Sequence, residues 1–426
     1  MGRPMKDSGV EWIGEIPEQW ETIKGKYLYS VKKGKLPNLY SSNINGDYLP
    51  YLSMEYQRSG GNPKEYASKK DGLMVNAGDI TVLWDGSNAG EFFKSREGIL
   101  SSTVALIKTN ALVESDYMYF SLKASEEDLK TKNTGMGIPH VNGNELKNNF
   151  YPMPPIEKQK EIVNKLTEKT LHIDSFIEKT KASIDAFKRY KQALITETVT
   201  KGLTPDVPMK DSGIEWIGMI PEYWESLRIK YASYLKGRIG WQGLTSEEYQ
   251  DEGPYLITGK DFDKGRVNWE TCTHITEERF DEAPDIHVKN GDLLITKDGT
   301  IGKVALISDL DEKASLNSGV LLIRKTKYFY DEKYLYYVLL SDVFWKWFNL
   351  IKSPNSTILH LYQNDFKDFS YPLPNISEQQ QIVAFLDEKT AHIDNLIQNK
   401  QAMIEKLEAY KKSLIYEYVT GKKEVE

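Results

Sequence analysis

Two short basic stretches carry the side chains that DNA-binding proteins use. The first, from Lys24 to Lys35, contains five lysines and no acidic residue, and the second, from Arg228 to Arg238, contains four basic residues and no acidic one. Lysine neutralises phosphate, while arginine and glutamine hydrogen-bond base edges with paired bonds. Recognition of DNA is therefore the chemistry that these stretches could perform. The alternative is that each is a solvated strand edge, where lysine limits aggregation.

The candidate DNA-binding residues lie in and just after these stretches, around two Asp-Gly turns, and in what looks like an exposed loop at 353–356. The dipeptides Asp85-Gly86 and Asp298-Gly299 each come after an apolar run and predict a strand followed by a tight turn. We nominate Lys33, Lys35, Trp84 and Ser87 in the first half of the chain, and Arg238, Trp241, Gln242, Lys297, Thr300, Lys303, Ser353, Asn355 and Ser356 in the second half. Some of these residues will contact only phosphates, which position a protein without specifying sequence. Trp84 and Trp241 could instead be structural.

The sequence lacks the patterns that indicate catalysis. A phosphate-binding loop reads G-x-x-x-x-G-K-[ST], and the segment from Gly299 to Lys303 has a different spacing. The segment from Met153 to Ile156 lacks the polar and aromatic members of an amino-methyltransferase motif. A single cysteine, Cys272, excludes a disulfide framework and a cysteine-based zinc site. We expect that the chain is not an enzyme and binds neither a metal nor a cofactor.

The sequence segments that must position these residues occur twice in the chain. Residues 5–21 and 209–225 agree in 14 of 17 positions, at an offset of 204. Residues 151–200 and 371–420 agree in 24 of 50 positions, at an offset of 220. The segments between these blocks differ in length and mostly in sequence. The chain is therefore an internal tandem duplication whose halves have kept their frame and changed their contents.

The second repeated block predicts a long helix in each half. Its seam residues recur at alternating spacings of three and four, the pattern of a coiled coil. They are Val163, Leu166, Thr170, Ile173, Ile177, Thr180, Ile184, Phe187, Lys191 and Leu194 in the first copy, and Val383, Leu386, Thr390, Ile393, Ile397, Lys400, Ile404, Leu407, Lys411 and Leu414 in the second. Gly202 and Gly421 stand where each helix should stop. A helix of about 45 residues, roughly 65 Å long, needs a partner. We expect the two copies to pair antiparallel within one chain, with pairing between chains as the alternative.

The segments between the repeats predict two mixed α/β (α+β) domains. Apolar runs at 79–84 and 292–297 predict strands before the turns, and 116–124 and 331–350 predict helices. We divide the chain into a first domain (1–152), a first long helix (153–202), a second domain (203–372) and a second long helix (373–426). The fold class is thus two α/β domains joined by two long helices that form an antiparallel coiled coil.

Composition limits the cellular setting and the mode of DNA binding. The net charge is −7 and the pI is near 5.6, which argues mildly against binding DNA without partners. No apolar run approaches the ~20 residues that span a bilayer, and no basic-then-apolar leader opens the sequence. We therefore expect a cytoplasmic protein that does not engage a membrane.

Several of these motifs resemble the specificity subunits of type I restriction-modification enzymes. The resemblance is carried by the block MKDSGVEWIGEIPEQW, by Tyr-Pro-x-Pro before Gln159 and Gln379, by the Thr-x-His-Ile-Asp boxes, and by the stretch 237–244. It covers essentially the whole chain, in the order recognition domain, spacer helix, recognition domain, spacer helix. It implies a non-catalytic subunit whose two domains each read one half of a split, asymmetric DNA site. The first domain departs from the second at Lys35-Leu36-Pro37, which makes its contacts less certain.

The resemblance also implies partners. The antiparallel helices would fix the distance between half-sites and dock two methyltransferase subunits, which methylate adenine N6, and motor-nuclease subunits would join for restriction. S-adenosylmethionine, ATP and magnesium are then expected on the partner subunits. Candidate docking residues are Glu168, Lys169, His172, Asp174, Glu388, Lys389, His392 and Asp394. For His172 and His392, which fall beside the seam, the alternative is an ordinary surface histidine. For the chain as a whole, the alternative is a protein-docking scaffold without direct DNA readout.

Overall fold

The computed structural model of the 426-residue chain describes residues 3–42, 46–135, 137–238, 244–327, 329–352 and 359–425. The chain packs into two units, which are residues 1–180 with 402–426 (unit 1) and residues 181–401 (unit 2). Each unit contains one α/β domain and part of both long helices. The four segments predicted from the sequence are each continuous in the chain. The two units are different divisions, because each long helix contributes one part to unit 1 and another part to unit 2.

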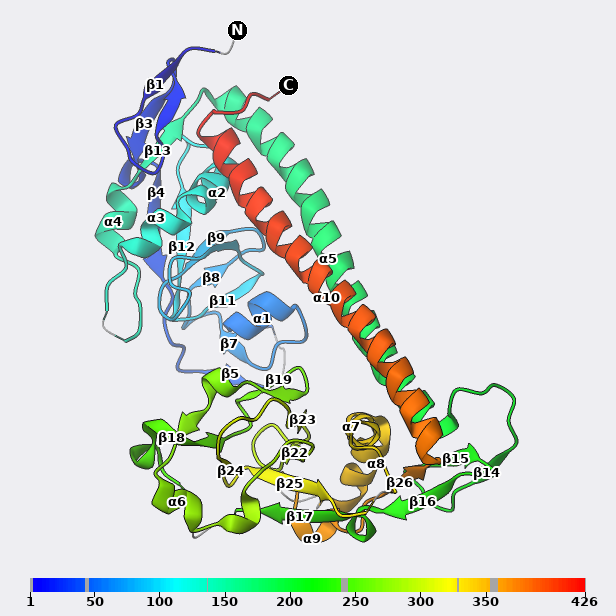
Figure 1. Ribbon diagram of the computed structural model, residues 1–426. Coiled ribbons are helices and arrows are strands. Elements are labelled where there is room, and N and C mark those ends of the chain that lie inside the picture. Colours follow the sequence, from blue (N-terminus) through cyan, green and yellow to red (C-terminus); the bar gives the residue numbers. More distant parts are fainter. Residues whose placement is uncertain are drawn as a thin grey trace. The chain divides into compact units, whose positions relative to one another are not determined.

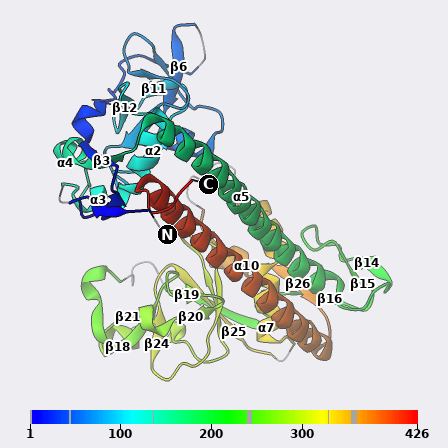
Figure 2. The same cartoon turned by 90° about the horizontal axis from the view of Figure 1, so that it is seen from above.

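The two long helices are α5 (Ile156–Lys201) and α10 (Ile376–Val419). The predicted seam is confirmed, because every seam residue of both helices is buried or half-buried. In unit 1, the ammonium of Lys411 lies 2.6 Å from both carboxylate oxygens of Asp174, and in unit 2 Lys191 contacts Asp394 at 2.6 and 2.7 Å. These contacts require the antiparallel arrangement within one chain, which Figures 1 and 2 show from two directions. Pairing between chains is not needed to cover the seam.

The ends of the helices follow from local sequence. Asn375 caps α10, since its side-chain oxygen accepts a hydrogen bond from the backbone N–H of Glu378 at 3.0 Å. Gly202 and Gly421 have φ values of 76° and 74°, so both occupy the left-handed conformation that ends a helix. The predicted helix stops are confirmed.

Each long helix is tied to its domain by the same buried hydrogen bonds in both units. The side chain of Gln159 donates to the carbonyl of Pro154 at 2.9 Å and accepts from the N–H of Glu114 at 2.8 Å. Gln379 donates to Pro374 at 2.8 Å and accepts from Asp331 at 2.7 Å. Because a buried amide without partners is costly, these two glutamines fix where each helix begins. This explains why both remain in the duplicated block.

A buried tyrosine joins both helix ends in each unit. The Tyr117 hydroxyl lies 2.9 Å from the carbonyl oxygen of Pro152 and 3.1 Å from that of Val419, the last residue of α10. The Tyr334 hydroxyl lies in the same way against Pro372 at 2.9 Å and Val199 at 3.3 Å, near the end of α5. Burial raises the pKa of both hydroxyls, so they remain protonated donors. Antiparallel pairing therefore places the start of one helix and the end of the other against the same domain.

Unit 1 contains a four-stranded sheet in the order β10-β9-β12-β4 and a five-stranded sheet in the order β5-β7-β6-β11-β8. Two further strand pairs are β1-β2, which lies in the repeated block 5–21, and β13-β3, which lies at the edges of the two repeated blocks. The strands are β1 (Met5–Asp7), β2 (Glu15–Pro17), β3 (Glu21–Lys24), β4 (Tyr29–Lys33), β5 (Tyr40–Ser41), β6 (Tyr48–Leu52), β7 (Tyr66–Ser68), β8 (Met74–Val75), β9 (Ile80–Leu83), β10 (Phe92–Lys94), β11 (Gly98–Leu100), β12 (Val104–Thr109) and β13 (Phe150–Met153). The short helices are α1 (Met54–Ser59), α2 (Ser115–Ala124), α3 (Glu126–Thr131) and α4 (Gly143–Asn148).

Unit 2 repeats this plan with a six-stranded sheet in the order β17-β25-β22-β23-β20-β19, a three-stranded sheet, β21-β18-β24, and the pairs β14-β15 and β16-β26. The strands are β14 (Met209–Asp211), β15 (Met219–Pro221), β16 (Glu225–Arg228), β17 (Ser233–Gly237), β18 (Gln250–Ile257), β19 (Phe262–Asp263), β20 (Arg266–Val267), β21 (Thr273–His274), β22 (Leu293–Thr296), β23 (Val304–Leu306), β24 (Ala314–Leu316), β25 (Val320–Lys325) and β26 (Ser370–Leu373). The helices are α6 (Glu277–Asp281), α7 (Glu332–Leu340), α8 (Asp342–Ile351) and α9 (Gln363–Phe366). The predicted mixed α/β class is confirmed.

One predicted helix is two helices. The segment 331–350 breaks at Ser341, whose backbone is extended and whose hydroxyl accepts a hydrogen bond from the N–H of Val343. Serine competes for backbone groups in this way and favours caps over helix interiors. The break lets Phe344 and Trp347 of α8 enter the same apolar core as Leu386 of α10.

Among the described residues, no helix combines the length and the apolar character that crossing a bilayer requires.

The end of α10 provides a test of how closely the repeated block at 5–21 docks on the helix pair. A Cβ on Gly421 would lie 2.6 Å from Cδ of Pro17, and its φ is 74°. Gly9, in the same block, has a φ of 69° but nothing within 4 Å of such a Cβ. We expect G421A to cost backbone strain plus about 1–3 kcal/mol of overpacking, and G9A to cost the strain alone. Thermal unfolding of the full chain should show a larger fall in Tm for G421A. Equal falls would show that the helix end does not press on Pro17.

Candidate nucleic-acid interface

The Asp-Gly turn of unit 1 holds a compact group of polar side chains. One carboxylate oxygen of Asp85 lies 2.7 Å from Nζ of Lys33, and the other lies 2.7 Å from Nδ1 of His140. The Lys33 ammonium also stands 6.0 Å from the ring centroid of Trp84, within the range of a cation–π contact. Partial burial acts to raise the pKa of Asp85, but the bonds from Lys33 and His140 outweigh it and lower that pKa. The turn therefore presents a fixed carboxylate with a lysine on one side and a histidine on the other.

Sheet register brings these residues together. Strands β4 and β9 both pair antiparallel with β12, which lies between them, so they run in the same direction. Lys33 pairs with Ala105 and Leu83 pairs with Val104, so β4 and β9 end at the same edge of the sheet. Lys33 and the turn that follows Leu83 consequently meet there. Residues 52 positions apart in the sequence become neighbours by register alone.

A small hollow adjoins this turn. It has a volume of about 370 Å³ and is lined by Val31, Lys33, Trp84, Asn142, Gly143, Asn144 and Lys147. Asn142 caps α4, because its side-chain oxygen accepts hydrogen bonds from the backbone N–H groups of Asn144 and Glu145. Lysine, amide and aromatic groups in one hollow are the set that contacts phosphates and bases.

The Asp-Gly turn of unit 2 is held in the same way. Asp298 pairs with Nδ1 of His360. The N–H of Leu361 donates to the carbonyl of Lys297 at 2.9 Å, as the N–H of Val141 donates to Trp84 at 2.9 Å in unit 1. Strands β17 and β22 flank β25 as β4 and β9 flank β12. The two domains therefore place and hold the turn in the same way although their loops differ in sequence.

The lysine beside the turn lies at the end of β4 in unit 1 and directly after β22 in unit 2. In unit 1 it is Lys33, the last residue of β4. In unit 2 the equivalent position is Gly237, and a Cβ built there would meet Cε of Lys297 at 3.5 Å. The N–H of Gly237 instead binds the side-chain oxygen of Gln363 at 3.1 Å. Each unit thus has one lysine side chain beside its Asp-Gly turn. Lys33 lies near the ring of Trp84 in unit 1, and Lys297 lies near Gly237 in unit 2.

Arg238 does not lie where the sequence suggested. Its side chain is buried, with 3% of the residue exposed, and its Nε donates to the carbonyl of Leu316 at 2.7 Å. A second nitrogen lies 3.2 Å from the Ser315 hydroxyl. Burial lowers the pKa of Arg238, although these bonds satisfy the buried guanidinium. Arg238 therefore braces β24 in the domain interior, and its nomination as a DNA-binding residue stays a prediction that this burial disfavours.

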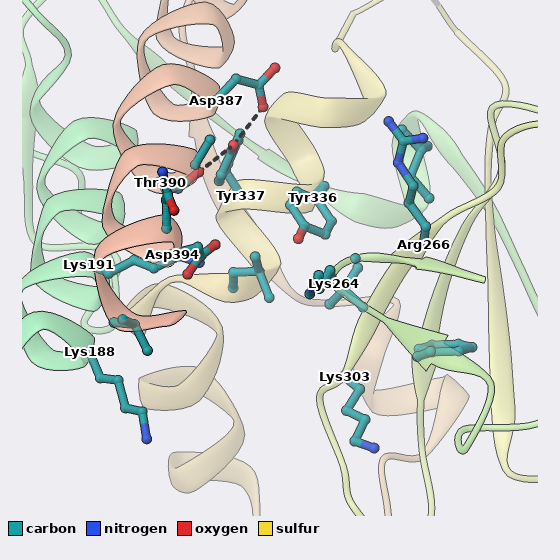
Figure 3. A pocket seen from close by; sticks show the side chains of 18 of the residues that line it. Lys188, Lys191, Lys264, Arg266, Lys303, Tyr336, Tyr337, Asp387, Thr390 and Asp394 are labelled. Carbon is teal, nitrogen blue, oxygen red and sulfur yellow. Dashed lines mark hydrogen bonds and ion pairs between the residues drawn. The ribbon is translucent and has the colours of Figure 1, made fainter. Parts of the chain in front are cut away.

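Lys303, which follows the Asp-Gly turn of unit 2 and pairs with Thr296, lines a groove of that unit. The groove has a volume of about 1290 Å³ and is lined on one side by the long helices, with Lys188, Lys191 and Asp394, and on the other by Lys264 and the sheet (Figure 3). In Figure 3, the Asp387 carboxylate and the Thr390 hydroxyl both bond the Tyr337 hydroxyl and brace the helix side of this groove.

The remaining DNA-binding nominations divide into two groups. Lys35, Ser87 and Thr300 are exposed, and Trp84 and Lys297 are half-buried beside the turns. The other nominated residues lie outside the described residues, and they are Trp241, Gln242, Ser353, Asn355 and Ser356. Nothing in the structure tests base contact for either group, so these assignments stay predictions.

The nominated docking residues lie on the long helices. Glu168, His172, Glu388, Lys389 and His392 are exposed, and Lys169 is half-buried. Asp174 and Asp394 have a further role, since each forms the ion pair between the helices described above. Their docking role stays a prediction.

His140 and His360 were not among the predicted site residues, although the sequence repeat relates them. The offset of 220 that relates residues 151–200 to 371–420 continues upstream to these two histidines and to Lys147 and Lys367. The chain has six histidines, and two of them stand at equivalent positions beside equivalent turns. Extending the repeat by eleven residues would have nominated both.

Comparison with known proteins agrees with this architecture. The family model for the type I restriction modification DNA specificity domain matches residues 17–186 and 244–406. The type I restriction enzyme MjaVIII specificity subunit of Methanocaldococcus jannaschii is 31% identical over 96% of this chain and 93% of that protein. The type I restriction enzyme EcoBI specificity subunit of Escherichia coli is 21% identical over 92% of this chain and 83% of that protein.

A solved structure supports the fold. A chain from work on complex assembly and conformational transition of the type I R-M system superposes with a TM-score of 0.68 at 16% identity, covering 95% of this chain and 98% of that chain. Two matched segments, one in each half of the chain, and full-length similarity to two specificity subunits leave one conclusion. The chain belongs to the family of type I restriction-modification DNA specificity subunits.

Proposed function

We propose that this chain reads a split DNA site without catalysing a reaction, and that each unit reads one half-site. The observation that carries the proposal is the pair of Asp-Gly turns, which follow equivalent strands and are held by equivalent histidines but present different side chains. The turn of unit 1 presents Lys33 and Trp84, whereas that of unit 2 presents Lys297, and the histidine that holds it packs on Tyr362. Equivalent frames with different contents would read two different sequences, which gives an asymmetric site.

Charge is consistent with a subunit that depends on its partners. Lys33 and Lys147 line the hollow beside the turn of unit 1, but the chain carries a net charge of −7. Phosphate contacts supply much of DNA affinity, so a local basic patch on an acidic chain should bind DNA weakly alone. Partner subunits would supply the remaining phosphate contacts. They would also carry S-adenosylmethionine, ATP and magnesium.

The long helices supply the spacing between half-sites in this proposal. Both are continuous, and each contributes residues to both units. Two readers must meet DNA at a defined helical phase, because one base pair turns the duplex by about a tenth of a turn. A continuous helix pair is stiffer than a loop, so it can set a constant gap.

Exposed apolar residues on the helices support docking of partner proteins. Tyr190 and Tyr410, which are related by the offset of 220, are 58% and 52% exposed. Leu171 and Phe176 are also exposed, at 63% and 51%. Tyrosine on a surface is enriched where proteins meet. Two equivalent exposed tyrosines fit two copies of one methyltransferase subunit, and motor-nuclease subunits would join that complex.

The spacing role is tested by lengthening both helices. The ion pairs Asp174–Lys411 and Lys191–Asp394 show that residues 175–190 face 395–410. Inserting four residues into each of these facing segments adds about 6 Å of helix. A four-residue insertion is a stutter, which changes the winding of the helix pair locally without ending the pairing. We expect the methylated motif, mapped genome-wide in cells that also express the methyltransferase subunit, to keep both half-sites and gain a longer gap.

The control is four residues inserted after Asp206, in the exposed segment that follows α5. It should leave the gap unchanged. An unchanged gap after the paired helix insertion, with both half-sites still methylated, would contradict the spacing role.

Docking is tested by removing the two tyrosines. Y410A and Y190A should each weaken the binding of one methyltransferase subunit. Each removes an aromatic contact that would become buried in the complex, and such a contact is worth about 2 kcal/mol or more. The mass of the purified complex should fall from two methyltransferase subunits to one in each single variant and to none in the double variant. Y27A, which removes a tyrosine that is 58% exposed in the first domain, is the control. A double variant that still holds two subunits would place the docking surface elsewhere.

A further inference from the structure

Each unit contains one histidine that holds the aspartate of its Asp-Gly turn. We define the turn clasp as Asp85 with His140 in unit 1 and Asp298 with His360 in unit 2. In both cases the histidine bonds through Nδ1 to one carboxylate oxygen. The two clasps are built from the same residue types at equivalent places, although the loops around them have changed.

Backbone bonds hold the same pieces together, so the side chains have a separate task. In unit 1, the N–H of Gly86 donates to the carbonyl of Pro139 at 3.0 Å, and the N–H of Val141 donates to Trp84 at 2.9 Å. His140 and Thr134 exchange two further backbone bonds, of 2.8 and 3.0 Å. The turn would therefore stay beside residues 134–141 without the imidazole. What the imidazole adds is a fixed orientation of the Asp85 carboxylate.

That orientation matters for the neighbouring lysine in unit 1. The Asp85 oxygen that does not face His140 binds Lys33, 45% of whose side chain is exposed. A carboxylate held at one oxygen offers the other in a single direction, so the lysine is directed as well. Without His140, Asp85 could rotate, and Lys33 would lose its defined place beside Trp84.

In unit 2 the same clasp directs an aromatic ring. The imidazole of His360 lies 4.4 Å from the ring of Tyr362, measured between centroids, and Tyr362 is 60% exposed. Fixing His360 through Asp298 therefore fixes the surface against which Tyr362 packs. The clasp is the same in both units, and the side chain that it directs is different.

We propose that His140 and His360 are positioning residues for DNA sequence readout, each acting through its aspartate on the half-site read by its own unit. The proposal rests on the proposed function, since it assumes one half-site per unit. The bond needs a proton on Nδ1, which both the neutral Nδ1–H tautomer and the imidazolium provide. The clasp therefore does not require a charged histidine.

The test compares variants that keep the ring with variants that keep the bond. H140F retains a planar ring but has no donor, whereas H140N carries an amide that can donate to Asp85; H360F and H360N form the matching pair in unit 2. H274F is the control, because it removes a bond from a histidine of unit 2 to the carbonyl of Gly253, away from the Asp-Gly turn. Each full-length variant is expressed and purified with the methyltransferase subunit, and adenine methylation is mapped at sites with single-base changes.

We expect H140F to raise methylation of sites mismatched in the first half-site by about tenfold relative to the matched site, the loss of one well-placed base contact. The second half-site and the gap should stay unchanged. H360F should give the reverse, while H140N, H360N and H274F should keep the original motif.

Three results would overturn the proposal. The first is full fidelity in both phenylalanine variants, and the second is equal relaxation of both half-sites in either one. The third is loss of the folded complex in H140F or H360F, which would make the clasp a structural element. If the unaltered chain gives no split motif, the proposed function itself has failed, which is a different outcome.

Discussion

The antiparallel pairing of α5 with α10 is the constraint on which the rest of the structure depends. Because the helices run in opposite directions, the start of each lies beside the end of the other. Each α/β domain therefore binds one helix start, through Gln159 or Gln379, and one helix end, through Tyr117 or Tyr334. A duplicated chain can close on itself in this way, with the same contacts made twice.

This constraint explains which parts of the two halves have stayed alike. The repeated blocks contain the helix seam, the strand pairs at the helix ends and the buried glutamines. Changing any of them would weaken contacts to both helices. The sheet edges that carry Lys33 and Lys297 do not touch those contacts, so their side chains were free to differ. Frame and recognition surface are thus separated within each unit.

The long helices could be predicted because their signal is periodic and local. Lys191 and Lys411 interrupt the apolar seam, yet each finds its aspartate, so even the exceptions fit antiparallel pairing. The strands before each Asp-Gly turn were predicted for the same reason, since an apolar run followed by a turn is local. Family membership could be predicted because the motifs occur together and in order.

The candidate site was less predictable because it depends on sheet register and burial. Arg238 has the residue type of a base reader, but only its burial and its bond to the carbonyl of Leu316 show that its side chain enters the domain interior. The break at Ser341 depends on whether its hydroxyl accepts a hydrogen bond from the backbone N–H of Val343, which composition does not reveal. His140 lies 55 residues from Asp85, so no spacing rule connects them. The sequence feature that relates His140 to His360 is the repeat offset of 220.

The most direct measurement is genome-wide adenine methylation in cells that express this chain with its methyltransferase subunit, compared with the methyltransferase subunit alone. The account predicts a new motif of two different half-sites separated by a constant gap. The absence of any new motif from a purified, intact complex would contradict DNA readout and support a protein-docking scaffold.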